Sequence, residues 1–417
     1  MLNKNIVNLN ESATLVINNN AKKLRQKGIK VYNMGLGQSP FPLPKQTVKA
    51  LQANADVNVY LPTNGLEALN NSIVKFYKNY HDLDVSPEQV LVGPGSKNLL
   101  FLLHLIWDGP TILPTPCWVS YGPQSRIFGK EPYLLHTRAE DEWKMAPQAL
   151  DDLARGIEGD ILLVFSSPSN PTGKTYTDKE LQALSEVMRS HKMLVVSDEI
   201  YALMNFYHSC SSLVKYYPEG TIISSGLSKW SAAGGWRLGT FIFPKSKLDL
   251  RKAMVVVGSE SFSSVCTPIQ YAAVTAFTEV DKKYISGCKK ILADLSFYAY
   301  DKLESAGLIT AKPDGGFYIF VDFANFRGKL ENMGITGSSS LCKALLEKLK
   351  IAALSGEACE RNSDELSIRL AYVNFDGAAA LKAAKNYDGP LNSEFIQRYC
   401  KETIAAIDLI ADWVKNL

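Results

Sequence analysis

Residues 160–201 read DILLVFSSPSNPTGKTYTDKELQALSEVMRSHKMLVVSDEIY, and they carry the clearest structural signal in the chain. Short, continuous apolar runs open and close this stretch, as is typical of parallel strands that are buried on both faces. Between the runs, Thr177 and Glu180 have the spacing of a helix capping box, and apolar residues then recur at helical spacing. The stretch therefore predicts a strand–helix–strand unit, with strands at 160–166 and 193–198.

Two further segments extend this pattern along the chain. Residues 221–225 (TIISS) form a third apolar run, which begins about 30 residues after the second, the length of a strand–helix–strand unit. Residues 89–92 (QVLV) lead through Gly-Pro-Gly-Ser into an apolar helix at 97–107. Alternating strands and helices predict an α/β fold, in which a mostly parallel central sheet lies between helices.

The pattern changes in the last third of the chain. Residues 316–323 (GFYIFVDF) alternate in polarity, which is typical of an antiparallel strand. Residues 393–417 place six residues on one helical face: Ile396, Cys400, Ile404, Ile407, Ile410 and Val414. We therefore predict a large domain at 41–290 and a smaller α+β domain made of 1–40 and 291–417. The N-terminal arm is expected to pack on the small domain or on a partner subunit.

The composition is that of a globular protein, since 46% of the 417 residues are hydrophobic, 21% are charged and the formal charge is +3. This balance disfavours disordered, collagen-like and coiled-coil chains, and it offers no basic stripe for nucleic acid. The strongest apolar run, 98–107, is too short to cross a membrane, and the first residues lack the apolar block of a signal peptide. The seven cysteines form no C-x-x-C pair and the five histidines no H-E-x-x-H motif, so we expect free thiols, no metal site and a cytoplasmic location.

Two segments resemble nucleotide-binding loops but depart from them. Gly93 and Gly95 follow a predicted strand, yet Asn98 stands where the dinucleotide fingerprint has its third glycine, and no acidic ribose ligand follows. An NAD site is therefore disfavoured, although the helix that begins there can serve either as an anion site or as an ordinary turn. Residues 173–175 (GKT) end like a P-loop, but Pro168 replaces its first glycine and lacks the N–H that a phosphate cradle needs.

Polar side chains follow three consecutive predicted strands. Asn170 lies beyond the first, Asp198 ends the second with Tyr201 close behind, and Lys229 follows the third, with Arg237 shortly after it. Singly, such residues serve as helix caps or surface charges. Together they point to one site, because the carboxyl ends of neighbouring strands in an open α/β sheet meet at one crevice.

The chemistry of this set points to one cofactor. A carboxylate can keep a heteroaromatic nitrogen protonated, and a phenol and an amide can hydrogen-bond a phenolate oxygen. A lysine can form a Schiff base with an aldehyde, and an arginine at a helix N-terminus suits a phosphate monoester. Pyridoxal 5′-phosphate (PLP) carries all four features.

An ordered series of motifs covers nearly the whole chain: 12–14 (SAT), 35–37 (GLG), 60–65 (YLPTNG), 95–97 (GSK), 117–121 (CWVSY), 169–173 (SNPTG), 197–201 (SDEIY), 228–230 (SKW), 235–239 (GWRLG) and 368–372 (IRLAY). With this series, the sequence resembles the class I/II aminotransferases of PLP fold type I, and the aspartate aminotransferases among them. The resemblance implies the PLP-dependent transferase fold, a transaminase and a homodimer.

The resemblance also implies roles for individual residues. Lys229 would bind PLP covalently and move the substrate proton, and Asp198 would pair with the ring nitrogen. Tyr201 and Asn170 would bind the phenolate oxygen, and Trp118 would stack on the ring. The phosphate would be held by a further set: Gly95, Ser96, Lys97, Ser228, Arg237 and the partner subunit's Tyr60.

Substrate recognition is expected from other positions. Arg369 would bind the α-carboxylate, with the backbone of Gly37 and the amide of Asn170 beside it. Lys97 resembles the lysine that binds the distal carboxylate in one group of bacterial aspartate aminotransferases, and residues 12–14 resemble the segment that closes over it. These features favour aspartate or glutamate as the donor and a 2-oxo acid as the acceptor, in a ping-pong reaction.

Three departures from the family pattern and several alternatives remain open. Gly226 replaces a serine that many relatives carry before the lysine, Cys359 stands where an aromatic residue is frequent, and residues 386–394 look like an insertion. An aromatic or broad-range aminotransferase shares every cofactor residue. A PLP-dependent lyase, such as a carbon–sulfur lyase, shares the fold. A PLP-binding regulator usually needs a winged-helix segment, for which the N-terminal part is too short.

Overall fold

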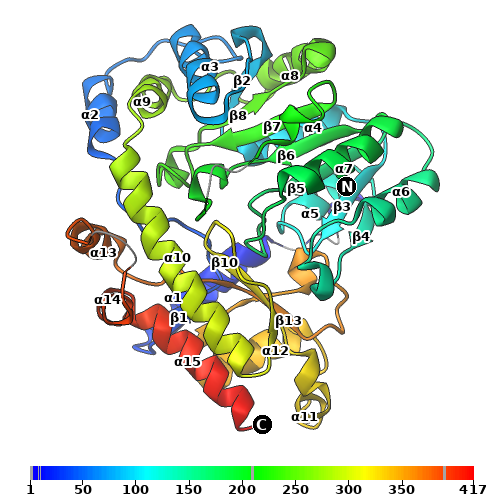
Figure 1. The fold of residues 1–417 in the computed structure, drawn as a ribbon. Coiled ribbons are helices and arrows are strands. Elements are labelled where there is room, and N and C mark those ends of the chain that lie inside the picture. The colour runs from blue at the N-terminus through cyan, green and yellow to red at the C-terminus, as the bar shows by residue number, and fades with distance from the viewer. Residues whose placement is uncertain (1–2, 8, 10, 208–210, 388–390) are drawn as a thin grey trace.

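The computed structural model describes residues 3–7, 9, 11–207, 211–387 and 391–417 (Figure 1). Its larger sheet has seven strands in the order β2-β8-β7-β6-β5-β3-β4. Their bounds are β2 (Val90–Gly93), β3 (Thr111–Thr115), β4 (Tyr133–His136), β5 (Leu162–Ser166), β6 (Leu194–Asp198), β7 (Thr221–Gly226) and β8 (Gly239–Ile242). β8 runs antiparallel to both of its neighbours, whereas the other neighbouring pairs are parallel. The predicted strands and the mostly parallel sheet are therefore confirmed.

Helices cover both faces of this sheet: α2 (Lys45–Ala53), α3 (Glu67–His81), α4 (Ser96–Ile106), α5 (Tyr121–Ile127), α6 (Pro147–Arg155), α7 (Asp178–Ser190), α8 (Leu248–Ser261) and α9 (Thr267–Thr278). The continuous apolar run of β5 has a simple reason. Leu162 and Val164 pack into the core under α4 and α8, whereas Leu163 and Phe165 pack into the core under α6 and α7. Alternate side chains of one strand thus fill two different cores.

The capping box predicted at the start of α7 is present. Thr177 N donates to Glu180 Oε2 at 2.7 Å, and Glu180 N donates to Thr177 Oγ1 at 3.3 Å. These two bonds satisfy backbone donors at the helix N-terminus that have no partner within the helix.

A second body contains a four-stranded antiparallel sheet in the order β12-β13-β10-β9. Its strands are β9 (Ile309–Thr310), β10 (Tyr318–Asp322), β12 (Leu354–Ser355) and β13 (Ser367–Ala371), and a parallel pair joins β1 (Tyr32–Asn33) to β11 (Ile351–Ala352). Its helices are α1 (Ala13–Gln26), α11 (Arg327–Glu331), α12 (Ser338–Ala344), α13 (Gly377–Ala384), α14 (Ser393–Tyr399) and α15 (Lys401–Lys415). The antiparallel strand predicted within 316–323 is confirmed as β10.

The long helix α10 (Lys282–Ser305) runs between the two bodies and packs along α15 (Figure 1). The domain bounds 41–290, 1–40 and 291–417 remain a proposal, and the boundary at 290 falls inside α10. The N-terminal helix α1 lies against β11 and β12. No helix in the described ranges combines the length and the apolar character that crossing a membrane requires.

The C-terminal segment differs from the prediction of one helical stretch. It forms two helices, α14 and α15, because the backbone of Cys400 leaves helical geometry at φ −122° and ψ 24°. The predicted face is nevertheless buried throughout: Ile396, Cys400, Ile404, Ile407, Ile410 and Val414. The spacing of apolar residues predicts which side chains are buried. It does not predict a break between two helices that share one core. The proposed insertion at 386–394 includes residues 388–390, which lie outside the described residues.

Candidate active site

Three neighbouring strands of the large sheet deliver the predicted residues to one place. β5, β6 and β7 lie side by side in parallel, and the register pairs Ser166 with Asp198 and Asp198 with Ser224. The loops that follow carry Asn170, Tyr201 and Lys229. The expected convergence at the carboxyl ends of the strands is therefore observed.

The second body closes this site from the other side. Arg369 on β13 donates from Nη1 to Asn170 Oδ1 at 3.0 Å and from Nη2 to Gly35 O at 2.6 Å. Lys229 Nζ donates to Gly37 O at 2.8 Å. The Arg369–Asn170 and Lys229–Gly37 contacts join the two bodies, so the site lies between them.

Asp198 is a buried carboxylate held by hydrogen bonds. Its Oδ2 accepts from the Tyr121 hydroxyl at 2.8 Å, and its Oδ1 accepts from Ser224 Oγ at 3.3 Å and from Ile200 N at 3.4 Å. Burial raises the pKa of Asp198 to about 6, although these hydrogen bonds and the nearby Lys229 oppose the rise. A cationic partner would favour the ionised form of this carboxylate.

Tyr121 is a site residue that the sequence analysis quoted within a motif but gave no role. It is fully buried, and its hydroxyl orients Asp198. The ring of Trp118 meets it edge-on, with 5.4 Å between the centroids. The only sequence signal was its place three residues after Trp118.

Lys229 is an amine in a desolvated setting. Burial lowers its pKa, and the positive charges of Arg369 and Arg237 add to the effect, while Tyr318 and Asp198 oppose it. A lowered pKa increases the fraction of neutral amine, which is the nucleophilic form. Ser228 lies beside it in the same loop and is half-buried.

Arg369 is 1% exposed, and its guanidinium stacks over the Tyr318 ring at 4.4 Å from the centroid. Its Nε is buried without a hydrogen-bond partner among the described residues. Buried polar atoms are nearly always satisfied, and a carboxylate is the natural partner of a guanidinium. This unpaired donor indicates a place for an anionic ligand group.

Tyr318 is the second site residue that the sequence analysis missed. Its hydroxyl accepts a hydrogen bond from the Tyr201 hydroxyl at 3.0 Å. A Cβ built on Gly37 would lie 1.6 Å from the Tyr318 hydroxyl oxygen, so only glycine fits there. The alternating pattern identified its strand, but not that this ring points into the site.

The start of α4 forms an anion cradle with Arg237. Gly95 has a φ of 90°, and a Cβ placed on it would lie 2.2 Å from Arg237 Nη2. A Cβ on Gly239 would lie 2.0 Å from Ser96 N. The two glycines therefore let β8 and the guanidinium approach the first turn of the helix, where free N–H groups and the helix dipole favour an anion.

Lys97 and Tyr60, two further predicted site residues, are both exposed. Lys97 is exposed, with its Nζ 5.7 Å from the centroid of the Trp118 ring, and desolvation and the nearby Arg237 lower its pKa. Tyr60 is 91% exposed.

Two of the departures have structural reasons. A Cβ on Gly226 would lie 2.6 Å from Leu238 O and 2.9 Å from Gly239 Cα, because β7 and β8 approach closely there. A serine at this position would therefore need the backbone to move. Cys359 is fully buried in a small core that includes Val119 and Trp143, and its carbonyl accepts from Cys117 N at 3.0 Å.

Comparisons with known proteins agree with this geometry. Residues 29–384 match the sequence model of the family described as aminotransferase class I and II. The aspartate aminotransferase of Bacillus subtilis (strain 168) is 32% identical over 381 residues, which cover 89% of this chain and 94% of that protein. The asparagine–oxo-acid transaminase of Streptococcus mutans is 28% identical over 366 residues, covering 85% and 91%.

Solved structures show the same fold. The aspartate aminotransferase from Thermus thermophilus with maleate superposes with a TM-score of 0.83 at 24% identity, covering 98% of this chain and 99% of that one. The enzyme from Rhizobium meliloti gives 0.84 at 23% identity, covering 99% of both chains. The fold is that of the PLP-dependent transferases of fold type I. The chain belongs to the class I and II aminotransferases, and it is a transaminase.

Proposed function

We propose that this aminotransferase holds PLP between Asp198, Lys229 and the N-terminus of α4. The observation that carries the proposal is that Asp198, Tyr201 and Lys229 meet at the carboxyl ends of β6 and β7, where Lys229 Nζ also donates to Gly37 O of the second body. Burial raises the pKa of the Asp198 carboxyl to about 6 and lowers that of the Lys229 amine. Groups whose pKa values are moved in this way are typical of acid–base sites. The cradle of Gly95 and Arg237 fits the phosphate.

The chain's own groups would then divide the work. Bound PLP supplies an electron sink for the bonds of the substrate α-carbon. Asp198 would keep the ring nitrogen protonated, and Lys229 Nζ would take the α-proton and return it. The remaining contacts to the cofactor are assigned as the resemblance implies: Tyr60 of the partner subunit, Ser96, Lys97, Trp118, Asn170, Tyr201, Ser228 and Arg237.

The proposed donor is an amino acid with a second carboxylate, aspartate or glutamate, and the proposed acceptor is a 2-oxo acid. Arg369, with its unpaired Nε, would bind the α-carboxylate beside Gly37 and Asn170. Lys97 would bind the distal carboxylate. In support, Ala13 and Ile17 of α1 pack on the core next to Trp118, which brings the N-terminal segment to the same side of the site.

The assembly and the location are also proposed. Val59 and Tyr60 are 56% and 91% exposed, an unusual state for adjacent large side chains that a homodimer interface would cover. The cysteines in the part of the chain that the structure describes are free thiols. Free thiols suit the reducing cytoplasm.

Borohydride reduction of the PLP-loaded enzyme, followed by peptide mapping, tests the cofactor site. The label should lie on Lys229, and a label on another lysine would overturn the assignment. Single-turnover spectra with aspartate, glutamate, asparagine and phenylalanine then rank the donors. Faster conversion by phenylalanine would contradict a dicarboxylate substrate.

Lys97→Ala tests the distal contact. A charge-assisted contact contributes about 1.5–3 kcal/mol, so kcat/KM for aspartate and glutamate should fall by about ten- to a hundredfold. Neutral donors should change little, since they offer the ammonium no partner. Equal losses for all donors would assign Lys97 to the phosphate or to the fold.

A further inference from the structure

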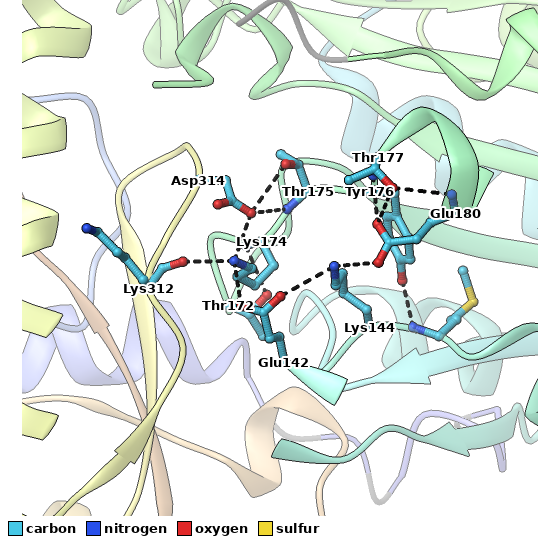
Figure 2. Close-up of polar contacts among 11 residues, drawn as sticks. Glu142, Lys144, Thr172, Lys174, Thr175, Tyr176, Thr177, Glu180, Lys312 and Asp314 are labelled. Carbon is cyan, nitrogen blue, oxygen red and sulfur yellow. Dashed lines mark hydrogen bonds and ion pairs between the residues drawn. The ribbon is translucent and has the colours of Figure 1, made fainter. Parts of the chain in front are cut away.

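Figure 2 shows a chain of charged side chains that links the two bodies of the molecule. Its centre is Lys174, in the segment that only superficially resembled a P-loop. The Lys174 side chain is 8% exposed, and its Nζ lies 2.9 Å from Glu142 Oε1 and 3.0 Å from Asp314 Oδ2. It also donates to Lys312 O at 3.0 Å. An ammonium has three N–H donors, so these three acceptors use all of them and leave none for a ligand.

The same chain continues away from the site. Lys144 Nζ lies 3.4 Å from Glu142 Oε2 and 2.6 Å from Glu180 Oε1, in the capping box of α7. Lys144 therefore shares the Glu142 carboxylate with Lys174. Unlike Lys174, it makes no contact in Figure 2 with the turn that holds Asp314. This makes Lys144 a matched control for Lys174.

Hydrogen bonds join the turn that holds Asp314 to the loop at 169–174 that holds Lys174, and these are the two fastened segments. Asp314 Oδ2 accepts from Thr175 N at 3.0 Å. The carbonyl of Gly173 accepts from Asp314 N at 2.8 Å and from Gly315 N at 3.0 Å. Gly173 has a φ of 75°, and a Cβ there would lie 2.7 Å from Pro313 Cβ, so this close approach requires glycine.

The loop and the turn each carry one group that holds Arg369, and the carbonyl of Gly35 is a third. The loop at 169–174 carries Asn170, whose Oδ1 accepts from Arg369 Nη1. The turn leads directly into Tyr318, whose ring lies under the guanidinium and whose hydroxyl meets Tyr201. Lys174 thus lies where the segments that carry two of the supports of Arg369 meet.

We propose that Lys174 is a positioning residue for the substrate α-carboxylate, acting through Asp314 and the two fastened segments on Arg369. The inference rests on the proposed function, in which Arg369 binds that carboxylate. Without the ammonium, Glu142 would keep Lys144, but Asp314 would lose its one cationic partner among the described residues. A partly buried, unpaired charge is strongly unfavourable. The turn would then move away from the loop, and Arg369 would lose its fixed orientation.

The test compares Lys174→Met with Lys144→Met in the PLP-loaded enzyme, with maleate as the probe of the carboxylate site. Lys174→Met should weaken maleate binding and raise the KM for aspartate by about ten- to a hundredfold, because small displacements of a positioning group have effects of this size. The kcat should change less, since uniform binding is lost. The half-reaction of propylamine, which has no carboxylate, should keep its rate. Lys144→Met should leave all four quantities near the wild-type values.

A second measurement does not depend on activity. In the cofactor-free protein, amide hydrogen exchange over residues 312–318 should be faster in Lys174→Met than in wild type or in Lys144→Met. If Lys174→Met does not fold, Asp314→Asn breaks the same contact from the other end with little change in shape. The variant that combines Lys174→Met with Asp314→Asn should lose no more maleate affinity than the weaker-binding of the two single variants, because both substitutions break the same contact.

Arg369→Lys separates the inference from the proposed function on which it rests. Unchanged maleate binding in Arg369→Lys would refute the proposed carboxylate site itself. If Arg369→Lys weakens binding but Lys174→Met and Asp314→Asn only lower the unfolding temperature, Lys174 is purely structural and the inference is overturned.

Discussion

Asp198→Asn should make the cofactor-free protein more stable at pH 8 while abolishing most of the turnover of the holoenzyme. The reason is that Asp198 is buried and its negative charge is poorly solvated. Burial raises its pKa from the ordinary 3.8 to about 6, so the ionised carboxylate opposes folding. Asparagine has nearly the same shape and carries no charge.

The size of the effect follows from the pKa. A difference between 3.8 and about 6 corresponds to about 3 kcal/mol of lost stability once the group is ionised in both states. The amide can accept from Tyr121 but offers Ile200 N no acceptor, and this lost hydrogen bond costs about 1 kcal/mol. The net gain at pH 8 is about 2 kcal/mol, or roughly 4–8 °C in the midpoint of thermal unfolding for a domain of this size.

The sign of the difference in stability between Asp198→Asn and wild type depends on pH. A raised carboxyl pKa carries no penalty below the ordinary value, and the penalty grows as pH rises from 3.8 to about 6. The difference in midpoint between Asp198→Asn and wild type should therefore be near zero or slightly negative at pH 4 and positive at pH 8. Thermal unfolding of the cofactor-free proteins from pH 4 to 8 measures this. A variant that is no more stable at pH 8 than at pH 4, relative to wild type, would refute the assignment of a buried, costly carboxylate.

Three further outcomes are expected. Lys229→Ala and Tyr60→Ala chains, each inactive alone, should recover about a quarter of wild-type activity when mixed. Half of the randomly formed dimers are then mixed, and each mixed dimer has one intact site of two. An absence of recovery would show that Tyr60 contributes to the site of its own chain. Tyr121→Phe removes a hydrogen bond that lowers the pKa of Asp198. The acid limb of the plot of kcat/KM against pH should therefore move up by about one pH unit, and an acid limb at the wild-type pH would contradict this role of Tyr121. Gly226→Ser should lower the unfolding midpoint by several degrees, since overpacking costs about 1–3 kcal/mol. Ser225→Ala, which adds no atoms to the neighbouring position, is the control, and a more stable Gly226→Ser variant would show that β7 and β8 can separate.

The local sequence was sufficient for four strands of the large sheet, for β10, for the start of α7 and for one side of the site. Apolar runs of four to seven residues report strands that are buried on both faces, and the capping box marks the start of α7. Parallel strands that alternate with helices must bring their carboxyl ends together. The placement of Asn170, Asp198, Tyr201 and Lys229 in one site therefore followed from their positions after consecutive strands.

The other side of the site depended on the tertiary structure. Tyr121 meets Asp198 across 77 residues of sequence, Tyr201 meets Tyr318 across 117, and Lys174 meets the carbonyl of Lys312 across 138. No local periodicity encodes such pairs. The first depends on how α5 packs on the large sheet, and the other two depend on how the second body packs against it. The break at Cys400 has the same cause, since a helix and a pair of helices can bury the same apolar residues. Periodicity records which side chains leave water, whereas the partner that each one meets is decided by the packing of distant segments.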